Sequence, residues 1–505
     1  MFSSAALLFL AGAILWLTSR AISKRRPAPL PPGPKPLPLI GNMFDMPTTK
    51  PWLTFADWAK YGDISHIEIL GRHIVVLNSV KVAVELLDKK SSKYSDRPIL
   101  PMGGELVGWK HALPLLPYGN LFRESRKQFH RAVGTRAALK AYHPIRKQEF
   151  HKFLKRLNEN PDDFALHIRR VVGSIILRIS HGYQVQGPND PFVGLAENAL
   201  LIWGKSTAPG AFLVDVLPFL QYVPEWVPGA GFQTTAREWK AEVLAMVDQP
   251  HQWVKEQMAA GVASKSFTST LLDVPSLTGD EDHAIKWSAA SFYGGGADTS
   301  VSAIHALFLA MTLYPEAQKK AQAEIDSVIG NDRLPTYTDR DSLPFIEALV
   351  KEVFRWHVIL PLAVPRLVSE DDTHEGYYIP KGTMVIPNSW FMLHDPRVYS
   401  DPMEFRPERF LGGGSKEPES DPRPIAFGFG RRFCPGMLFG DESLWLASAA
   451  TLAVFDITKA VENGVEITPE FDPSSHSISH LKPFKCSIKP RSARAIELIV
   501  QDTYS

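Results

Sequence analysis

The sequence predicts a mainly α-helical fold with a small β component. Helical periodicity of apolar residues dominates the chain from about Phe122 to His357. Alternation of apolar and polar residues, which is typical of strands, marks His66–Leu70 and His73–Leu77 near the front. The chain has 505 residues, of which 45% are hydrophobic and 22% charged, so its composition is that of a globular protein rather than a disordered or fibrous one.

Charge and cysteine content narrow the class of protein. The 55 Lys and Arg residues against 54 Asp and Glu residues leave a net charge of +1, so no strong field attracts nucleic acid. Two cysteines, Cys434 and Cys486, are too few for a disulfide framework or a four-thiolate metal site. An exported protein in which these two cysteines form a single disulfide is an alternative. The composition favours a large intracellular or membrane-attached enzyme.

Residues 1–19 are predicted to form a transmembrane signal anchor, because they carry no charged side chain. Nineteen helical residues reach roughly 28 Å, close to the ~30 Å hydrocarbon core of a bilayer. Basic residues follow at once, and the positive-inside rule then keeps the rest of the chain in the cytosol; they are Arg20, Lys24, Arg25 and Arg26. A cleaved signal peptide, or a helix buried in the protein, is the alternative.

Residues 20–42 are predicted to be a basic and proline-rich hinge. Seven prolines between Pro27 and Asn42 exclude a helix and favour an extended segment, either a linker or a spacer that orients the body on the membrane. Residues 43–505 then form one body without an internal boundary, in which only Gly412–Pro422 has the composition of an inserted loop. Its longest predicted helices are Ile285–Tyr314, which ends before Pro315, and Pro344–His357.

The most specific motif is the segment FGFGRRFCPG, Phe427–Gly436, around the single thiol of Cys434. A helical pattern begins at Met437, so the thiol lies just before a helix N-terminus, where the helix dipole favours a thiolate. Close backbone approach and positive charge are provided by Gly428, Gly430, Gly436, Arg431 and Arg432. Such a thiolate suits a nucleophile, a redox thiol or a metal ligand; an inert buried cysteine is the structural alternative.

This segment resembles the haem-binding signature of the cytochrome P450 family. The five signature positions are occupied by Phe427, Gly430, Arg432, Cys434 and Gly436. The resemblance implies the family's fold, a mainly α body with a small β-rich lobe. It also implies that Cys434 is the axial ligand of the iron of haem b and that Arg432 pairs with a haem propionate. A thiolate ligand pushes electron density onto the iron and favours cleavage of the O–O bond.

A second motif, Gly294–Ser300, lies within the predicted helix Ile285–Tyr314. Each glycine in a helix interior costs roughly 1 kcal/mol relative to alanine, and close helix packing would account for only one or two of the three. Gly295–Ser300 is similar to the oxygen-activating helix motif of the cytochrome P450 family. By this resemblance the glycines open a groove over the haem, Thr299 hydrogen-bonds the bound oxygen, and Asp298 helps to relay protons.

The pair Glu352 and Arg355 lies on the predicted helix Pro344–His357. Taken alone, an acid and a base at this spacing are typical of a solvated salt bridge. The family, however, places Glu-x-x-Arg on this helix and connects it to an arginine in a later loop, which is Arg409 here. The implied role of the triad is structural, close to the thiolate loop.

Two further arginines are weaker candidates for contacts to the haem propionates. The segment Leu121–Arg126 resembles the family's Trp-x-x-x-Arg helix, with Phe122 in place of tryptophan, and Arg126 keeps the cation. Arg366 stands where many relatives carry a basic propionate ligand. A surface position without a functional role is the alternative for both arginines.

The resemblance therefore implies a haem-thiolate monooxygenase, similar to fungal microsomal members, in a single-pass arrangement on the endoplasmic reticulum. It would hydroxylate or epoxidise a lipophilic substrate in secondary metabolism, for example in terpenoid biosynthesis. No nicotinamide- or flavin-binding motif is visible, so electrons would come from NADPH through a separate cytochrome P450 reductase, with cytochrome b5 as an optional second donor. Alternatives are detoxification of xenobiotics, a reductase-independent isomerase or dehydratase, and a haem sensor or carrier.

The family's substrate-contacting regions are mainly apolar in this chain, which favours a hydrophobic ligand that enters from the membrane. Packing of the core explains the same composition equally well. These regions are Leu100–Pro117, about Leu200–Val223, Phe292–Ala297, Ile359–Val364 and Ser477–Ser479.

Overall fold

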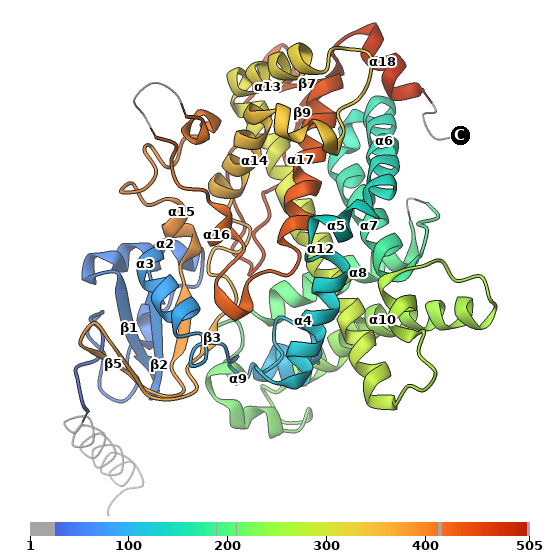
Figure 1. Cartoon of the computed structure of the whole chain (residues 1–505). Helices are drawn as coiled ribbons and strands as arrows, with labels where there is room; N and C mark the ends of the chain where they lie inside the picture. The colour runs from blue at the N-terminus through green and yellow to red at the C-terminus, as the bar shows by residue number, and fades with distance from the viewer. Residues whose placement is uncertain (1–25, 188, 209, 413–416, 502–505) are drawn as a thin grey trace, which may run out of the picture. The chain divides into compact units, whose positions relative to one another are not determined.

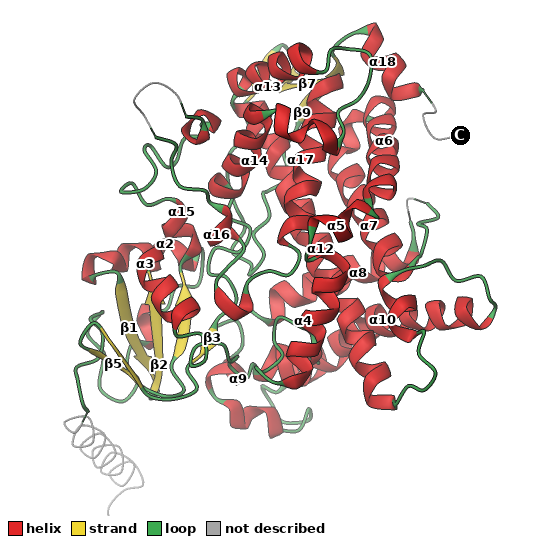
Figure 2. Ribbon diagram, viewed as in Figure 1, coloured by secondary structure: helices red, strands yellow, loops and turns green. Residues whose placement is uncertain are grey.

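The computed structural model describes residues 26–187, 189–208, 210–412 and 417–501. Helices predominate in these residues and the strands form small sheets, which confirms the predicted mainly α fold with a minor β component (Figure 2). The chain divides into two compact units. Unit 1 comprises the residues up to Pro98, Leu360–Met392 and Gly428–Phe433; unit 2 comprises Ile99–Ile359, Leu393–Phe427 and the chain from Cys434 onward.

The predicted membrane anchor, residues 1–19, lies outside the described residues. Among the residues that are described, the helix α12 (Gly279–Leu313) is the one long and apolar enough to cross a membrane. Because 67% of its most apolar stretch is buried within the protein, α12 has the character of a core helix.

A mixed four-stranded sheet forms the centre of unit 1. The strands β1 (Ile64–Ile69) and β2 (Arg72–Leu77) pair antiparallel, as the alternating pattern predicted. Parallel to β2 lies β6 (Met384–Pro387), and β3 (Arg366–Leu367) completes the order β1-β2-β6-β3. The last two strands are too short for their pattern to be recognised in the sequence.

The other elements of unit 1 are short. Residues 27–42 contain no helix, as their prolines predicted, and the carbonyl of Pro32 accepts a 2.8 Å hydrogen bond from the backbone of His66 in β1. The remaining elements are α2 (Pro51–Asp57), α3 (Val80–Ala83), a π-helical turn (Val84–Lys89), and the hairpin of β4 (Asp372–His374) and β5 (Tyr377–Ile379), while α15 (Ser389–Leu393) follows β6.

Unit 2 is built around α12, which packs against α4, α7, α8, α10, α14 and α17 (Figure 1). A three-stranded sheet has the order β8-β7-β9, with β7 (Phe455–Glu462), β8 (Val465–Ile467) and β9 (Cys486–Pro490). The helices are α4 (Asn120–Val133), α5 (Arg136–Lys140), α6 (His143–Glu159), α7 (Phe164–His181), α8 (Pro191–Ser206), α9 (Leu213–Val216), α10 (Gly231–Ala259), α11 (Phe267–Leu272), α13 (Pro315–Val328), α14 (Pro344–Trp356), α16 (Arg423–Ala426), α17 (Met437–Val454) and α18 (Ala493–Val500).

The helices that carry the sequence motifs begin and end for identifiable reasons. α12 starts earlier than its apolar pattern predicted, because Thr278 and Glu281 form a capping box at its N-terminus. It ends before Pro315, as predicted. α14 has proline in its first turn, and α17 begins at Met437, where the helical pattern begins in the sequence.

Candidate active site

Cys434 lies in the loop that leads into α17. Its backbone N–H donates to the carbonyl of Phe427 at 2.9 Å, which closes the loop ahead of the helix. Gly436 is the N-cap of α17, and a Cβ added there would lie 4.0 Å from the Cys434 sulfur. The ring of Phe427 contacts Phe354 of α14 edge to face, with centroids 5.0 Å apart. The thiol is therefore placed just before a helix N-terminus, by a loop fastened to the helical core.

The N–H of Gly436 at the start of α17 lowers the pKa of the Cys434 thiol, in the direction that the sequence predicted, but burial acts the opposite way. Burial raises the pKa of this thiol and outweighs the opposing effects of the Gly436 N–H and the Arg126 guanidinium. Proximity to a dipole end can be recognised in the sequence, whereas removal of water from the sulfur depends on tertiary packing. A bound metal ion reverses this balance, because a coordinating thiol is deprotonated outright.

Two glycines of the segment Phe427–Gly436 that belong to unit 1, Gly428 and Gly430, adopt backbone geometry that favours glycine. Gly430 has φ of +51°, and a Cβ added to it would lie 2.0 Å from the carbonyl oxygen of Leu87 in the π-helical turn. Gly428 has φ of +84°, which side chains other than glycine rarely adopt. The sequence therefore requires glycine at both positions for reasons of backbone geometry.

Two arginines that the resemblance assigns to propionates are held by backbone carbonyls within unit 1. The Nε of Arg432 donates to the carbonyl of Ser95 at 2.7 Å. Arg366 is 3% exposed and donates to the carbonyl of Phe429 at 2.5 Å, and burial lowers its pKa to about 10. Carbonyls satisfy the geometry of a guanidinium without neutralising it, while the charge of Asp88 partly opposes the effect of burial on the pKa of Arg366.

Sequence reasoning missed a third arginine in this cluster. Arg97 is 8% exposed and donates to the carbonyls of Val364 and Pro365, both at 2.6 Å. Its pKa is lowered by burial and by the neighbouring charges of Arg432 and Arg366. No motif surrounds Arg97, so only the fold reveals that it joins them. A cluster of three cations suits an anionic ligand.

In unit 2, the three glycines of α12 differ in what surrounds them. A Cβ on Gly296 would lie 2.8 Å from Ile176 of α7, and one on Gly294 would lie 3.3 Å from Leu200 of α8. Close packing thus explains these two glycines. A Cβ on Gly295 would meet nothing within 4 Å, and Gly295 is exposed directly after the buried stretch Phe292–Gly294. The core helix therefore has one open position at its centre.

Thr299 and Asp298 lie one turn beyond Gly295. The Thr299 hydroxyl donates to the Gly295 carbonyl at 2.8 Å, so the side chain is held against the open position. The Asp298 carboxylate lies 3.0 Å from the Nε2 of His480, which belongs to the C-terminal part of the chain. Sequence reasoning identified the acid and the alcohol but not this histidine, which lies outside every motif.

Arg126, on α4, is close enough to Cys434 for its charge to lower the pKa of the thiol. Since α12 packs against both α4 and α17, unit 2 brings together the thiol, the cation and the helix with the open position. Phe122, in place of the family's tryptophan, is 4% exposed on the same helix. These residues fit a haem: a soft sulfur ligand, a cation for a propionate, and space beside a helix for a bound gas.

Glu352, Arg355 and Arg409 form a fully buried network. The Glu352 carboxylate accepts from Arg355 at 2.7 and 2.8 Å and from Arg409 at 3.1 Å. Arg409 also pairs with Glu419 at 2.6 Å. The side chains of all three triad residues are 0% exposed, so the contact is not the solvated salt bridge that its spacing alone favours.

The combination of a half-buried loop thiol, an open core helix and a Glu–Arg–Arg network fits a haem-thiolate oxygenase. The cytochrome P450 family model matches residues 31–485. The chain belongs to the cytochrome P450 family and is a monooxygenase, an oxidoreductase that incorporates oxygen from dioxygen. Membership implies a haem-thiolate cofactor, a redox partner and a lipophilic substrate.

Similar relatives come from fungi. Cytochrome P450 monooxygenase 208 of Postia placenta is 49% identical over 488 residues, which cover 96% of this chain and 95% of the relative. Cytochrome P450 monooxygenase claR of Ampulloclitocybe clavipes is 48% identical, with 93% and 88% covered. Cytochrome P450 monooxygenase ppsD of Aspergillus oryzae is 42% identical, with 93% and 90% covered.

Proposed function

We propose that this monooxygenase binds haem b through Cys434 and inserts one oxygen atom into a lipophilic small molecule, by hydroxylation or epoxidation. The observation that carries the proposal is the open position at Gly295 in a core helix that packs against the elements bearing Arg126 and the thiol loop. Arg126, Arg366 and Arg432 would pair with the haem propionates. When bound, the haem supplies reductive activation of dioxygen, which a thiolate ligand favours.

The residues of α12 handle protons in this proposal. The Thr299 hydroxyl, now bonded to the Gly295 carbonyl, turns to donate toward the open position. The Asp298 carboxylate is 23% exposed, so it exchanges protons with water and passes them toward Thr299. The Glu352–Arg355–Arg409 network holds α14 and the loop of Arg409 together, and it takes no part in bond making.

Electrons reach the enzyme from NADPH through a separate cytochrome P450 reductase, with cytochrome b5 as an optional second donor. In this proposal residues 1–19 anchor the protein in the endoplasmic reticulum membrane, residues 20–42 form the hinge, and residues 43–505 form the catalytic domain in the cytosol. The cluster of basic residues after residue 19 supports this orientation.

The proposed physiological role is oxidation of a secondary metabolite, such as a terpenoid. It is supported by the apolar composition of the substrate-contacting regions, in which Phe292 and Ala297 of α12 are 5% and 9% exposed. The fungal origin of the similar monooxygenases supports it as well. Detoxification of aromatic xenobiotics is the alternative that the same apolar lining allows.

Turnover by the purified full chain tests this proposal. Haem-loaded protein is incubated with NADPH, with or without reductase, and with panels of terpenoids and aromatic xenobiotics, while the haem spectrum and products are recorded. Reductase-dependent oxygenation of terpenoids is the expected result. Oxygenation of the xenobiotic panel alone would favour detoxification. Conversion without reductase would indicate an isomerase or dehydratase, and binding without any product would indicate a sensor or carrier.

A further inference from the structure

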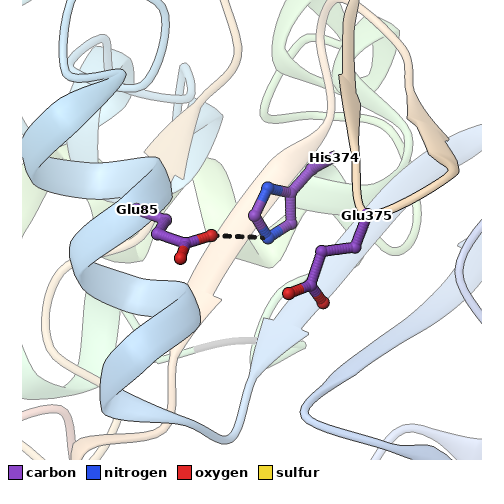
Figure 3. A group of neighbouring side chains, drawn as sticks. All are labelled: Glu85, His374 and Glu375. Atoms are coloured by element: carbon purple, nitrogen blue, oxygen red, sulfur yellow. Dashed lines mark ion pairs between the residues drawn. The ribbon is translucent and has the colours of Figure 1, made fainter.

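Away from the candidate active site, unit 1 brings together three side chains with metal-ligand chemistry. Glu85 extends from the π-helical turn after α3, His374 ends β4, and Glu375 follows in the turn to β5 (Figure 3). Their ligand atoms all lie within 4.8 Å of one another. Figure 3 shows the imidazole of His374 between the two carboxylates.

The histidine of this group has an unsatisfied polar atom. His374 is 6% exposed, and its Nε2 is buried without a hydrogen-bond partner. The same atom points toward the Glu85 carboxylate, at 3.6 Å, which is too long for a hydrogen bond. A buried polar atom without a partner is costly and often indicates a missing ion or water.

We propose that Glu85, His374 and Glu375 bind a divalent transition-metal ion, with Zn²⁺ the best fit. Imidazole and carboxylate are zinc ligands, and water fills the fourth tetrahedral position. Tetrahedral zinc holds its ligand atoms roughly 3.3 Å apart, close to the 3.6 Å between Glu85 and His374. The imidazole disfavours Ca²⁺ and Mg²⁺, which take oxygen ligands.

One cation already competes for the site. The ammonium of Lys81 lies 3.2 Å from the Glu375 carboxylate, and both side chains are exposed. Metal binding requires Glu375 to turn from Lys81 toward His374, which exposed side chains do at little cost. Removal of Lys81 is therefore expected to tighten the binding of zinc.

Zinc titration of untagged, haem-loaded protein, stripped beforehand with a chelator, tests the proposal by calorimetry. One zinc per chain is expected, with affinity at least about tenfold weaker in Glu85→Gln and His374→Gln and stronger in Lys81→Met. Glu370→Gln, which removes a nearby carboxylate paired with Lys93 at 3.6 Å, is the matched control and is expected to bind as the wild type does. Retained haem and circular dichroism spectra establish that the variants fold. The absence of stoichiometric binding, or equal affinity in all folded variants, would overturn the site.

An independent observation in unit 2 concerns the histidine beside Asp298. Two consecutive residues, Ser479 and His480, bind two positions of α12 that are four residues apart and so share one face. The Ser302 hydroxyl donates to the Ser479 carbonyl at 2.6 Å, and the His480 Nε2 lies 3.0 Å from the Asp298 carboxylate. His357 also contacts the Ser302 hydroxyl, at 2.8 Å. The backbone that carries His480 is thus fixed relative to α12.

We infer that His480 is a positioning residue for Asp298 and holds its carboxylate in the orientation from which protons pass to Thr299. This inference rests on the proposed relay. His480 and Asp298 are 28% and 23% exposed, so both reach water as well as each other. Without the imidazole, the carboxylate rotates freely and spends less time oriented toward Thr299.

The coupling of NADPH oxidation to product tests this role in the full, haem-loaded chain. His480→Ala is expected to lower coupling several-fold and to raise hydrogen peroxide release. His480→Gln retains an N–H donor and is expected to restore much of the coupling. The matched control is Lys482→Met, which removes an exposed cation paired with Asp472 on the same segment and is expected to leave coupling unchanged.

A double-mutant cycle provides a readout that does not depend on activity. Thermal unfolding of Asp298→Asn, His480→Ala and the double variant is expected to show non-additive changes in stability, because the two side chains interact directly.

If Asp298→Asn leaves coupling unchanged, the proposed relay itself fails. If Asp298→Asn uncouples the enzyme but His480→Ala does not, the relay stands and the role of His480 is overturned.

Discussion

At the scale of single residues, the Gly295 carbonyl and water compete for the Thr299 hydroxyl. The hydroxyl donates to the Gly295 carbonyl at 2.8 Å, a bond that hydroxyls often make within helices. Gly295 is exposed, so water can replace this bond when the hydroxyl turns away. The cost of reorienting Thr299 is therefore small, which suits its proposed role of donating a hydrogen bond only during turnover.

Thr299→Ala is expected to retain haem, fold and substrate binding but to divert NADPH into hydrogen peroxide. Without the hydroxyl, the proton needed for O–O cleavage arrives too slowly, and loss of such a group typically costs about 10²–10⁴-fold. Product formed per NADPH is measured at one fixed reductase ratio. Thr299→Ser keeps the hydroxyl and is expected to stay coupled. Full coupling in Thr299→Ala would remove this residue from the mechanism.

At the scale of elements, substitutions of two adjacent glycines in α12 distinguish a role in helix packing from a role in the active site. Gly296→Ala is expected to be less stable than Gly295→Ala, because its Cβ would lie 2.8 Å from the buried Ile176 side chain, and overpacking of about 1–3 kcal/mol offsets the same gain in helix propensity. Gly295→Ala gains about 1 kcal/mol of helix propensity and meets no neighbour, so it is expected to fold at least as well as the wild type. It is also expected to slow carbon monoxide binding to the reduced haem. Unfolding and ligand-binding rates are the measurements, and equal effects of the two variants would contradict the open position at Gly295.

The network on α14 gives a second prediction at this scale. Glu352→Gln removes the carboxylate that Arg355 and Arg409 share; Arg409 keeps Glu419, whereas the 0% exposed side chain of Arg355 loses its ion-pair partner, which typically costs about 3–5 kcal/mol. Loss of haem-loaded, soluble protein is expected. Glu347→Gln on the same helix is the control, because Glu347 also pairs with Arg340 and Arg423 but is 24% exposed. Comparable yields of haem-loaded, soluble protein from the two variants would contradict the expectation that burial of Glu352 makes its loss more costly.

Elements marked by a proline or by a regular apolar pattern could be predicted from the sequence. Elements that form only through contacts with distant residues could not. The proline after α12 marks its end, and alternation of residue types marks β1 and β2. The two residues of β3 form a strand only because β6 lies beside them, so no periodicity could reveal it. The same limit applies to Arg97 and His480, whose partners are distant in sequence.

At the scale of the whole molecule, motifs distributed along the chain establish the family, whereas local environments still depend on packing. Cys434 illustrates both: its signature is visible in the sequence, yet the pKa of its thiol is raised by burial rather than lowered by the helix dipole. Substrate identity cannot be predicted from the sequence for the same reason, because the lining of a pocket and the packing of a core have the same apolar composition.

Buried histidines predict the acid stability of the protein. Burial lowers the pKa of His181 and His357 to about 3 and that of His305 to about 4, against 6.5 in an unfolded chain. Between these values the unfolded state binds more protons, so stability is fully present above about pH 6.5 and is lost as the pH falls. Each such histidine costs about 2 kcal/mol by pH 5.

His357→Gln, which keeps a donor for Ser302, is expected to reduce the loss of unfolding free energy between pH 7 and pH 5 by about 2 kcal/mol. Denaturant unfolding at the two pH values measures this loss. His130→Gln changes an exposed histidine and is expected to leave the pH dependence as in the wild type. An unchanged slope in His357→Gln would show that His357 is not neutral in the folded protein.

The most direct test of the whole account is the spectrum of the reduced carbon monoxide complex in Cys434→Ser and Cys486→Ser. Cys486 is 7% exposed in β9, away from the signature loop Phe427–Gly436, and is the matched control. Cys434→Ser is expected to abolish the thiolate-type band and all monooxygenation, while Cys486→Ser is expected to retain both. A thiolate-type band in Cys434→Ser, or equal loss in the two variants, would contradict haem ligation by Cys434.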